Sequence, residues 1–174
     1  METFFSGKKE YRSLSNFWEG DVHIGDRIYE SGEHCFHGEK YTRLGEMCLD
    51  ESRRQELLAY GRTFLKSSGF TPAVAKRRGG KKGFRLSDTE LETWSSINMD
   101  VQQSICQWKL DHEEEVRQDL LKSGTKILIH PALRCSVEKL SSRVWEGRGT
   151  LVDGTVVVLG KNQLGNLWMK LRQN

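Results

Sequence analysis

One long segment with helical spacing, residues 87–110, limits the folds open to this chain more than any other feature. It opens with Ser87 and Glu90, a pair of side chains that forms a capping box at a helix N-terminus. Apolar residues then recur every three or four positions, at Trp94, Ile97, Val101, Ile105 and Trp108. Because such a helix has an apolar face to bury, the rest of the chain must supply a core around it.

Shorter elements are predicted on both sides of this segment. Four more helices are expected, at residues 50–69, 71–78, 112–124 and 162–173. Gly25-Asp26 lies between alternating residues and predicts a hairpin with a type II′ turn. Residues 125–130 and 154–160 are typical of short buried strands. These elements predict an α+β fold, a mostly helical single domain over residues 1–174 with a few short strands.

Composition narrows the class of protein. The 174 residues carry 29% charged side chains and a net charge of +3, and no apolar run approaches the ~20 residues of a membrane-spanning helix. The N-terminus lacks a signal-peptide pattern, so we expect a soluble intracellular protein, cytoplasmic or nuclear, without a membrane partner. Cysteines 35, 48, 106 and 135 form no CxxC pair, which favours reduced, mostly buried thiols.

A basic segment at residues 75–85 is the strongest local concentration of charge. It holds Lys76, Arg77, Arg78, Lys81, Lys82 and Arg85. Such a segment is either a solvated surface loop or a site for phosphates, and the sequence leaves both open.

The stretch "SGEHCFHGEKY", residues 31–41, gathers acids, histidines, a thiol and a lysine. Ser31 can cap a helix, and at 100° per residue Glu33, His37 and Lys40 then share one face. Zinc is one alternative, but the two histidines are three residues apart and no distant Cys/His pair completes four ligands. We therefore expect no metal.

A nucleophilic Cys35 is a second alternative. Its base would have to be the distant His23, His112 or His130, so a buried structural thiol is favoured. Carboxylate chemistry is the third: Glu33 could act as a general acid or base, and a desolvated Lys40 could attack a sugar carbon. An ordinary surface Glu–Lys pair is the competing interpretation.

The C-terminal region is rich in glycine, at positions 147, 149, 154, 160 and 165. It brings Trp145 and Asn162 to a loop that ends at a helix N-terminus, with Asn162 as its predicted cap. A helix end can hold a phosphate or a sugar hydroxyl, and tryptophan can cover a base. A turn returning the chain to the core explains the pattern as well.

Several motifs taken together resemble the NADAR family, also called YbiA-like. They are "LSNFW" at 14–18, "YESGEHCFHGEKY" at 29–41, Trp94 with Lys109, "VWEGRG" at 144–149 and "GKNQLGNLWMKLR" at 160–172. They follow the family's order and cover almost the whole chain. The resemblance implies an α+β fold and hydrolysis of an N-glycosidic bond to ribose, without a cofactor.

The resemblance also implies residue roles. Glu33 and Lys40 match the catalytic centre. The matching ligand-binding positions are Asn16, Phe17, Phe36, Trp94, Lys109, Trp145 and Asn162. Ser142 stands where many relatives carry an aspartate, the loop that follows is longer than in short bacterial forms, and His37 replaces a common glutamine.

The resemblance, together with the Glu33/Lys40 face and the basic segment, thus implies a hydrolase that removes ADP-ribose from guanine in DNA or RNA, which we expect to be a monomer. Its expected substrate is an ADP-ribosylated nucleic acid or nucleoside. An N-glycosidase acting on phosphorylated riboflavin-pathway intermediates and a non-catalytic ADP-ribose-binding module are the alternatives.

Overall fold

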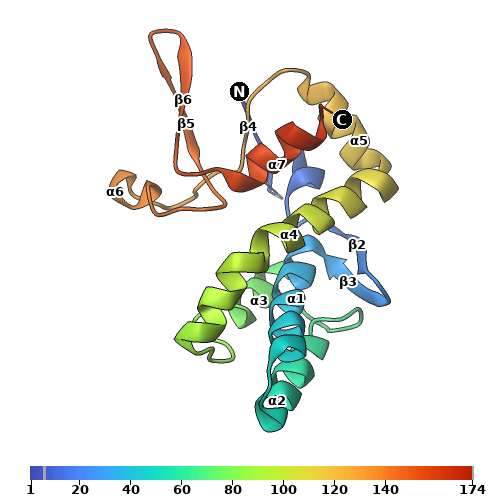
Figure 1. Cartoon of the computed structure of the whole chain (residues 1–174). Helices are drawn as coiled ribbons and strands as arrows, with labels where there is room; N and C mark the ends of the chain where they lie inside the picture. The colour runs from blue at the N-terminus through green and yellow to red at the C-terminus, as the bar shows by residue number, and fades with distance from the viewer. Residues whose placement is uncertain (6, 174) are drawn as a thin grey trace. The chain divides into compact units, whose positions relative to one another are not determined.

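The protein is described here by a computed structural model that covers residues 1–5 and 7–173 (Figure 1). Most of the secondary structure is helical, with three two-stranded sheets among the described residues. The α-helices are α1 Gly32–Met47, α2 Glu51–Arg62, α3 Pro72–Arg78, α4 Asp88–His112, α5 Glu114–Ser123, α6 Val137–Leu140 and α7 Gln163–Leu171. The predicted α+β, mostly helical fold is confirmed.

The strands are short, and one 3₁₀ turn precedes the first hairpin. They are β1 Glu2–Thr3, β2 Glu19–Ile24, β3 Arg27–Ser31, β4 Leu128–Ile129, β5 Arg148–Val152 and β6 Thr155–Leu159, with the 3₁₀ turn at Arg12–Leu14. Among the described residues, no helix combines the length and the apolar character that crossing a bilayer requires.

The chain divides into two compact units. The central unit is Asn16–Lys109, and the terminal unit combines Met1–Ser15 with Leu110–Asn174. The expectation of one domain over residues 1–174 stays a prediction.

The central unit begins with the β2–β3 hairpin and continues through α1, α2, α3 and most of α4. β2 and β3 are antiparallel, and Ile24 pairs with Arg27 across the turn. Gly25, the first turn residue, has φ of +60°, as a type II′ turn requires. The predicted hairpin is confirmed.

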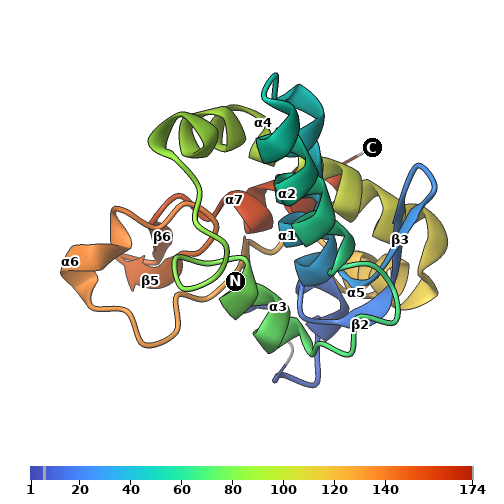
Figure 2. The same cartoon turned by 90° about the horizontal axis from the view of Figure 1, so that it is seen from below.

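Helices α1 and α2 pack side by side, and two glycines allow their close approach (Figure 2). A Cβ atom at Gly45 would lie 2.8 Å from Leu58 Cγ, and one at Gly61 would lie 2.6 Å from Thr42 Oγ1. The core beside them is built mainly of large apolar side chains from β2, β3, α1, α2, the segment after α2, and α4. It includes Val22, Tyr29, Tyr41, Leu44, Leu57, Phe64, Trp94, Val101 and Ile105.

The predicted helix at 50–69 is wrong at its C-terminal end, because α2 ends at Arg62. The chain turns at Thr63, and Phe64 is fully buried against Tyr41 and Tyr60. Burial of this aromatic ring in the core outweighs the helical propensity of the following residues. Two other helix starts in this unit are as predicted: Thr71 caps α3 with Pro72 in its first turn, and Ser87 and Glu90 form the capping box of α4.

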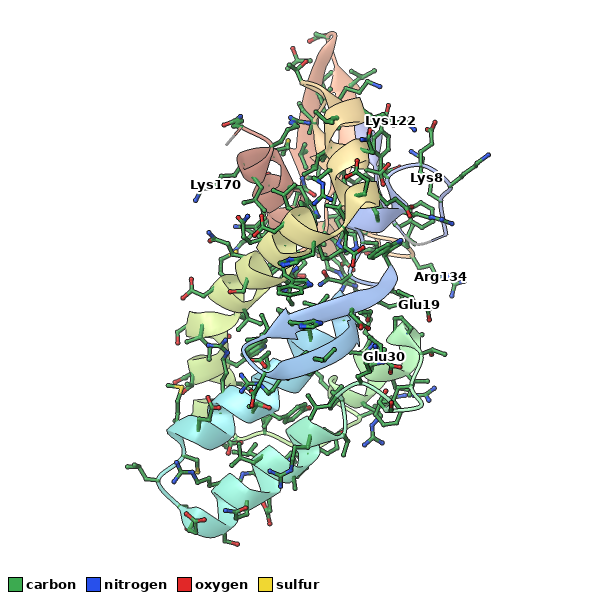
Figure 3. The ribbon with its side chains drawn as sticks, turned by 90° about the vertical axis from the view of Figure 1, so that its right-hand side faces the viewer. Lys8, Glu19, Glu30, Lys122, Arg134 and Lys170 are labelled. Carbon is green, nitrogen blue, oxygen red and sulfur yellow. The ribbon has the colours of Figure 1, made fainter. Side chains whose placement is uncertain are left out.

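The terminal unit joins the two ends of the chain. β1 pairs in parallel with β4, and the buried Trp168 of α7 donates from Nε1 to the Leu14 carbonyl oxygen at 2.9 Å. α5 ends at Ser123, and the following Gly124 has φ of +50°, which agrees with the helix end predicted at residue 124. Lys122 of α5 and Lys170 of α7 point outward in Figure 3.

The prediction of a buried strand at 154–160 is correct in position and wrong in burial. β6 pairs only with β5 within a two-stranded sheet, so alternate side chains have no second layer to pack against. Leu151, Val152, Val157 and Leu159 are exposed as a result. The turn at Asp153-Gly154 has positive φ at both residues, which matches a type I′ hairpin.

Candidate active site

The N-terminus of α1 is fixed by short-range contacts that the sequence predicts in part. Ser31 caps the helix by accepting a hydrogen bond from the His34 N–H at 3.2 Å, so the predicted cap is confirmed. The Glu33 N–H donates to the Asn16 carbonyl oxygen at 2.8 Å. A Cβ at Gly32 would lie 2.7 Å from Asn16 Oδ1, so only glycine fits there. These contacts fix the direction in which α1 presents Glu33.

His34 is explained by the fold alone. One ring nitrogen, Nδ1, lies 2.7 Å from Ser31 Oγ, and Nε2 lies 3.0 Å from the Phe70 carbonyl oxygen. Both nitrogens are therefore engaged in contacts that join α1 to its neighbours.

Glu33 is 8% exposed and is bound by the histidine one turn further along α1. His37 Nε2 lies 2.9 Å from Glu33 Oε1, and His37 is itself 9% exposed. The sequence placed Glu33, His37 and Lys40 on one face but assigned no role to His37. The i,i+4 spacing was the signal that could have identified this contact.

Lys40 is also buried, at 7% exposed, and it donates from Nζ to the Gly79 carbonyl oxygen at the end of α3. Burial lowers the pKa of Lys40 to about 8, and the charge of Glu33 partly offsets this effect by raising it. Seven residues of helix separate the two backbones by about 10 Å along the axis. Glu33 and Lys40 are thus two turns apart on one buried face, with His37 between them.

Gly79, the C-cap residue that follows α3, lies close against this face. A Cβ atom there would lie 2.1 Å from His37 Nδ1 and 2.2 Å from His37 Cγ. Its carbonyl oxygen accepts the bond from Lys40. A residue without a side chain therefore contacts both His37 and Lys40.

The aromatic residues predicted to bind ligand in the central unit lie close to α1 or α3. The Phe36 ring is 5.0 Å from the Trp94 ring and 5.4 Å from the His37 ring, in edge-to-face geometry. Lys76 Nζ lies 5.5 Å from the Phe17 ring centroid. Phe36 therefore adjoins His37 and Trp94 packs on Phe36, while Phe17 lies beside the basic segment.

Asn16 and Lys109 are more deeply buried than surface ligand contacts usually are. The Asn16 carboxamide exchanges two hydrogen bonds with Gln102, at 2.7 and 3.0 Å. Lys109 is fully buried, and its Nζ lies 5.4 Å from the Trp18 ring centroid. Their ligand-binding roles stay predictions.

Trp145 and Asn162 belong to the terminal unit. Asn162 occupies the N-cap position of α7, but its side chain makes no capping bond, so that part of the prediction is wrong. Its carboxamide instead accepts from the His130 N–H at 3.0 Å and donates to the Leu128 carbonyl oxygen at 2.9 Å. Strand β4 thus competes successfully for this side chain. Trp145 is half-buried.

The alternative chemistries find little support in the residues described. Cys35 is fully buried, and burial raises the pKa of its thiol, which disfavours the reactive thiolate. His23, one of its candidate bases, stacks on Trp108 with ring centroids 4.3 Å apart. Within residues 1–5 and 7–173, no group of three His, Cys, Asp or Glu side chains is placed to hold a metal ion.

The basic segment forms the end of α3 and the loop after it. Lys76, Arg77, Lys81, Lys82 and Arg85 are exposed. Arg78 differs, since its guanidinium lies 4.5 Å from the Phe70 ring and 5.2 Å from the Tyr60 ring. The loop itself is anchored, because Tyr60 donates to the Arg78 carbonyl oxygen at 2.8 Å.

Comparison with known proteins agrees with this fold. No protein-family model and no curated protein matches the chain. Among solved structures, the chain is similar to the NMR structure of the E. coli protein YbiA, with a TM-score of 0.61 and 26% sequence identity. The match covers 99% of this chain and 82% of that one. The fold is therefore YbiA-like, a fold consistent with an N-glycosidic hydrolase.

Proposed function

We propose that this chain is a NADAR-type hydrolase that removes ADP-ribose from guanine bases in nucleic acid. The observation that carries the proposal is the buried face of α1. It holds a carboxylate and an amine within one helix, and burial lowers the pKa of that amine to about 8. In an exposed Glu–Lys pair, which is the competing interpretation of the sequence, the pKa of the lysine amine would keep its usual value.

The proposed reaction divides the work between these two groups. Cleavage of an N-glycosidic bond passes through an electron-poor, oxocarbenium-like sugar carbon. Neutral Lys40 attacks or stabilises that carbon, and a pKa near 8 makes the neutral form accessible around neutral pH. Glu33, a carboxylate at the start, takes up the proton that the attacking amine or water loses and passes it to the departing guanine nitrogen as the bond between that nitrogen and the sugar carbon breaks. To attack, Lys40 must first release the Gly79 carbonyl oxygen.

Two features favour a nucleic-acid substrate over a small phosphorylated one. The exposed lysines and arginines at residues 76–85 can contact several phosphates of a strand. Phe36, backed by the buried Trp94, places an aromatic ring next to His37, where a base extruded from its stack could be covered. A guanine modified in single-stranded nucleic acid would be the most accessible target.

The direct test is turnover of an oligonucleotide that carries ADP-ribosylated guanosine, followed by mass spectrometry. The wild type should release unmodified guanosine oligonucleotide, and Glu33→Gln should be slower by about 100-fold or more. Glu46→Gln is the matched control, because Glu46 lies on the same helix with a half-exposed side chain. Equal rates for Glu33→Gln and the wild type would remove Glu33 from the mechanism.

A non-catalytic ADP-ribose-binding module is the first rival. It would bind the modified oligonucleotide, yet neither the wild type nor any variant would release product.

Borohydride trapping examines the covalent step separately: a Schiff base would leave the sugar attached to Lys40. An unmodified Lys40 during turnover would indicate direct attack by water.

The second rival acts on phosphorylated riboflavin-pathway intermediates and does not need the basic segment. Replacing Lys81 and Lys82 with alanine should weaken oligonucleotide binding and lower its salt slope by about two. Turnover of a small phosphorylated substrate should not change. Oligonucleotide binding that is indifferent to both lysines would favour the small-molecule enzyme.

A further inference from the structure

His37 is a buried side chain whose two ring nitrogens have different surroundings. Nε2 lies 2.9 Å from Glu33 Oε1. Nδ1 is buried and has no hydrogen-bond partner among the residues that the structure describes. It faces Gly79, where an added Cβ would lie only 2.1 Å away. A buried polar atom without a partner is rare in folded proteins and requires a reason.

These surroundings select one tautomer of the imidazole. An ionised Glu33 accepts hydrogen bonds only, so the shared proton belongs to His37 Nε2. A proton on Nδ1 would be a buried N–H donor against Gly79, whose carbonyl oxygen already accepts from Lys40. A lone pair at Nδ1 is the less costly arrangement. The geometry therefore assigns the hydrogen-bond donor of His37 to Nε2, which points at Glu33 Oε1.

We propose that His37 is a positioning residue that holds Glu33 in its reactive state, a role that rests on the proposed function. Its Nε2–H bond to Oε1 stabilises the carboxylate and fixes its rotamer. When Glu33 takes up a proton, the bond at Oε1 favours protonation at Oε2, the oxygen that then acts as acid. Gly79 leaves room for the ring in this position, because any side chain at residue 79 would displace it.

The contacts described for Glu33 include titratable groups of the same helix. On α1 they are His37 and Lys40, and Lys40 acts on Glu33 through its charge. At the end of α3, the residue packed against His37 is the uncharged Gly79. Two charged residues of α3 have other aromatic neighbours: Lys76 lies over the Phe17 ring, and Arg78 lies over the Phe70 ring. Asn16 contributes only a backbone carbonyl oxygen to the Glu33 N–H. A change at His37 should thus be read most directly in the titration of Glu33.

The experiment compares wild type, His37→Phe and His37→Gln by ¹³C NMR of the glutamate carboxyl groups across pH. Phenylalanine keeps a ring but removes the donor, whereas glutamine keeps an N–H donor. In His37→Phe the titration midpoint of Glu33 should rise by about one pH unit. In His37→Gln it should stay within about 0.3 unit of wild type. The half-exposed Glu46 is an internal control that should not move.

Kinetics supplies the second measurement. We expect His37→Phe to lower kcat by at least about tenfold with KM within about threefold, and His37→Gln to recover most of the loss. A folded His37→Phe with an unchanged Glu33 titration would overturn the proposal. If the wild type removes no ADP-ribose from the oligonucleotide, the proposed function fails, while the titration still decides whether His37 binds Glu33.

The wild type alone provides a check if His37→Phe does not fold. ¹⁵N chemical shifts of His37 should show a protonated Nε2 and an unprotonated Nδ1 at neutral pH. Glu33→Gln should change the Nε2 shift, and Glu46→Gln should leave it as in wild type. A protonated Nδ1 in the wild type would contradict the tautomer on which the proposal depends.

Discussion

Two polar clusters lie on α1, and they differ in how completely their groups are paired. In the Glu39 cluster, both carboxylate oxygens are saturated. Oε1 accepts from Arg27 Nε at 2.7 Å and Tyr29 at 2.8 Å, and Oε2 accepts from Arg27 Nη2 at 3.0 Å and Arg43 at 2.9 Å. In the Glu33 cluster, formed with His37 and Lys40, a buried ring nitrogen is left without a partner among the described residues.

The pKa directions separate the clusters in the same way. Burial alone would raise the pKa of Glu39, but the bonds from Arg27, Tyr29 and Arg43 together hold it below its usual value. In the other cluster burial prevails, and it lowers the pKa of Lys40 to about 8. A saturated cluster stabilises the fold, whereas an incompletely paired one keeps groups available for chemistry. The predictions below test this division.

The largest expected effect is on the saturated cluster. Glu39→Ala should lower the free energy of unfolding by about 3 kcal/mol, because it leaves the buried Tyr29 hydroxyl and two guanidinium groups without their acceptor. Glu33→Gln should change it by less than about 1 kcal/mol. Urea denaturation at neutral pH measures both. The comparison fails if the two substitutions destabilise equally.

The Glu39 contribution should also depend on pH. Since the pKa of Glu39 is lowered on folding, its stabilisation is present above the unfolded pKa and is lost as pH falls through the folded pKa. The difference between wild type and Glu39→Ala should therefore shrink in acid. A constant difference from neutral to strongly acidic pH would argue against the paired carboxylate.

A glycine substitution should disturb the Glu33 cluster from α3. Gly79→Ala places a Cβ 2.1 Å from His37 Nδ1, so the ring must move, at an expected cost of about 2 kcal/mol. Gly80→Ala is the matched control, since its nearest contacts are ordinary ones at 3.4 Å. The unfolding temperature and the turnover rate should both fall for Gly79→Ala, and both should stay near wild type for Gly80→Ala.

Lys40 should give a smaller, pH-dependent signal. Its pKa falls from the usual 10.5 to about 8 on folding, so between these values the unfolded chain binds more protons. Stability should therefore rise with pH in that window, by about 1 kcal/mol per pH unit from this group. Lys40→Met should flatten the slope, measured as the difference from wild type. Parallel curves would show that Lys40 keeps an ordinary pKa.

The smallest effect is expected at the edge of the Glu39 cluster. Glu46 is 3.7 Å from Arg27 Nη1, but its side chain is 54% exposed. Exposed pairs contribute little, so Glu46→Gln should change the free energy of unfolding by less than about 0.5 kcal/mol. A loss comparable to that of Glu39→Ala would mean that pairing with Arg27, rather than saturation of a buried carboxylate, is what stabilises the cluster.

The sequence by itself determined the elements whose signals are local. Three helices start where their capping side chains predict, at Ser31, at Thr71 and at the Ser87–Glu90 pair. The turn at Gly25-Asp26 follows from the glycine at its first position, which adopts the positive φ that the turn needs. Helical periodicity also placed Glu33, His37 and Lys40 on one face. These features depend on residues at most a few positions apart, so no long-range contact is needed to specify them.

Only the tertiary structure decided what those side chains contact. Burial of Phe64 ended α2 at Arg62, β4 took the carboxamide of Asn162, and the lack of a covering layer left β6 exposed. Gly79 lies 39 residues after Lys40, and nothing in the spacing shows that its carbonyl oxygen would receive the amine. Burial and saturation depend on neighbours that are distant in sequence, and they distinguish Glu33 from Glu39 on the same helix.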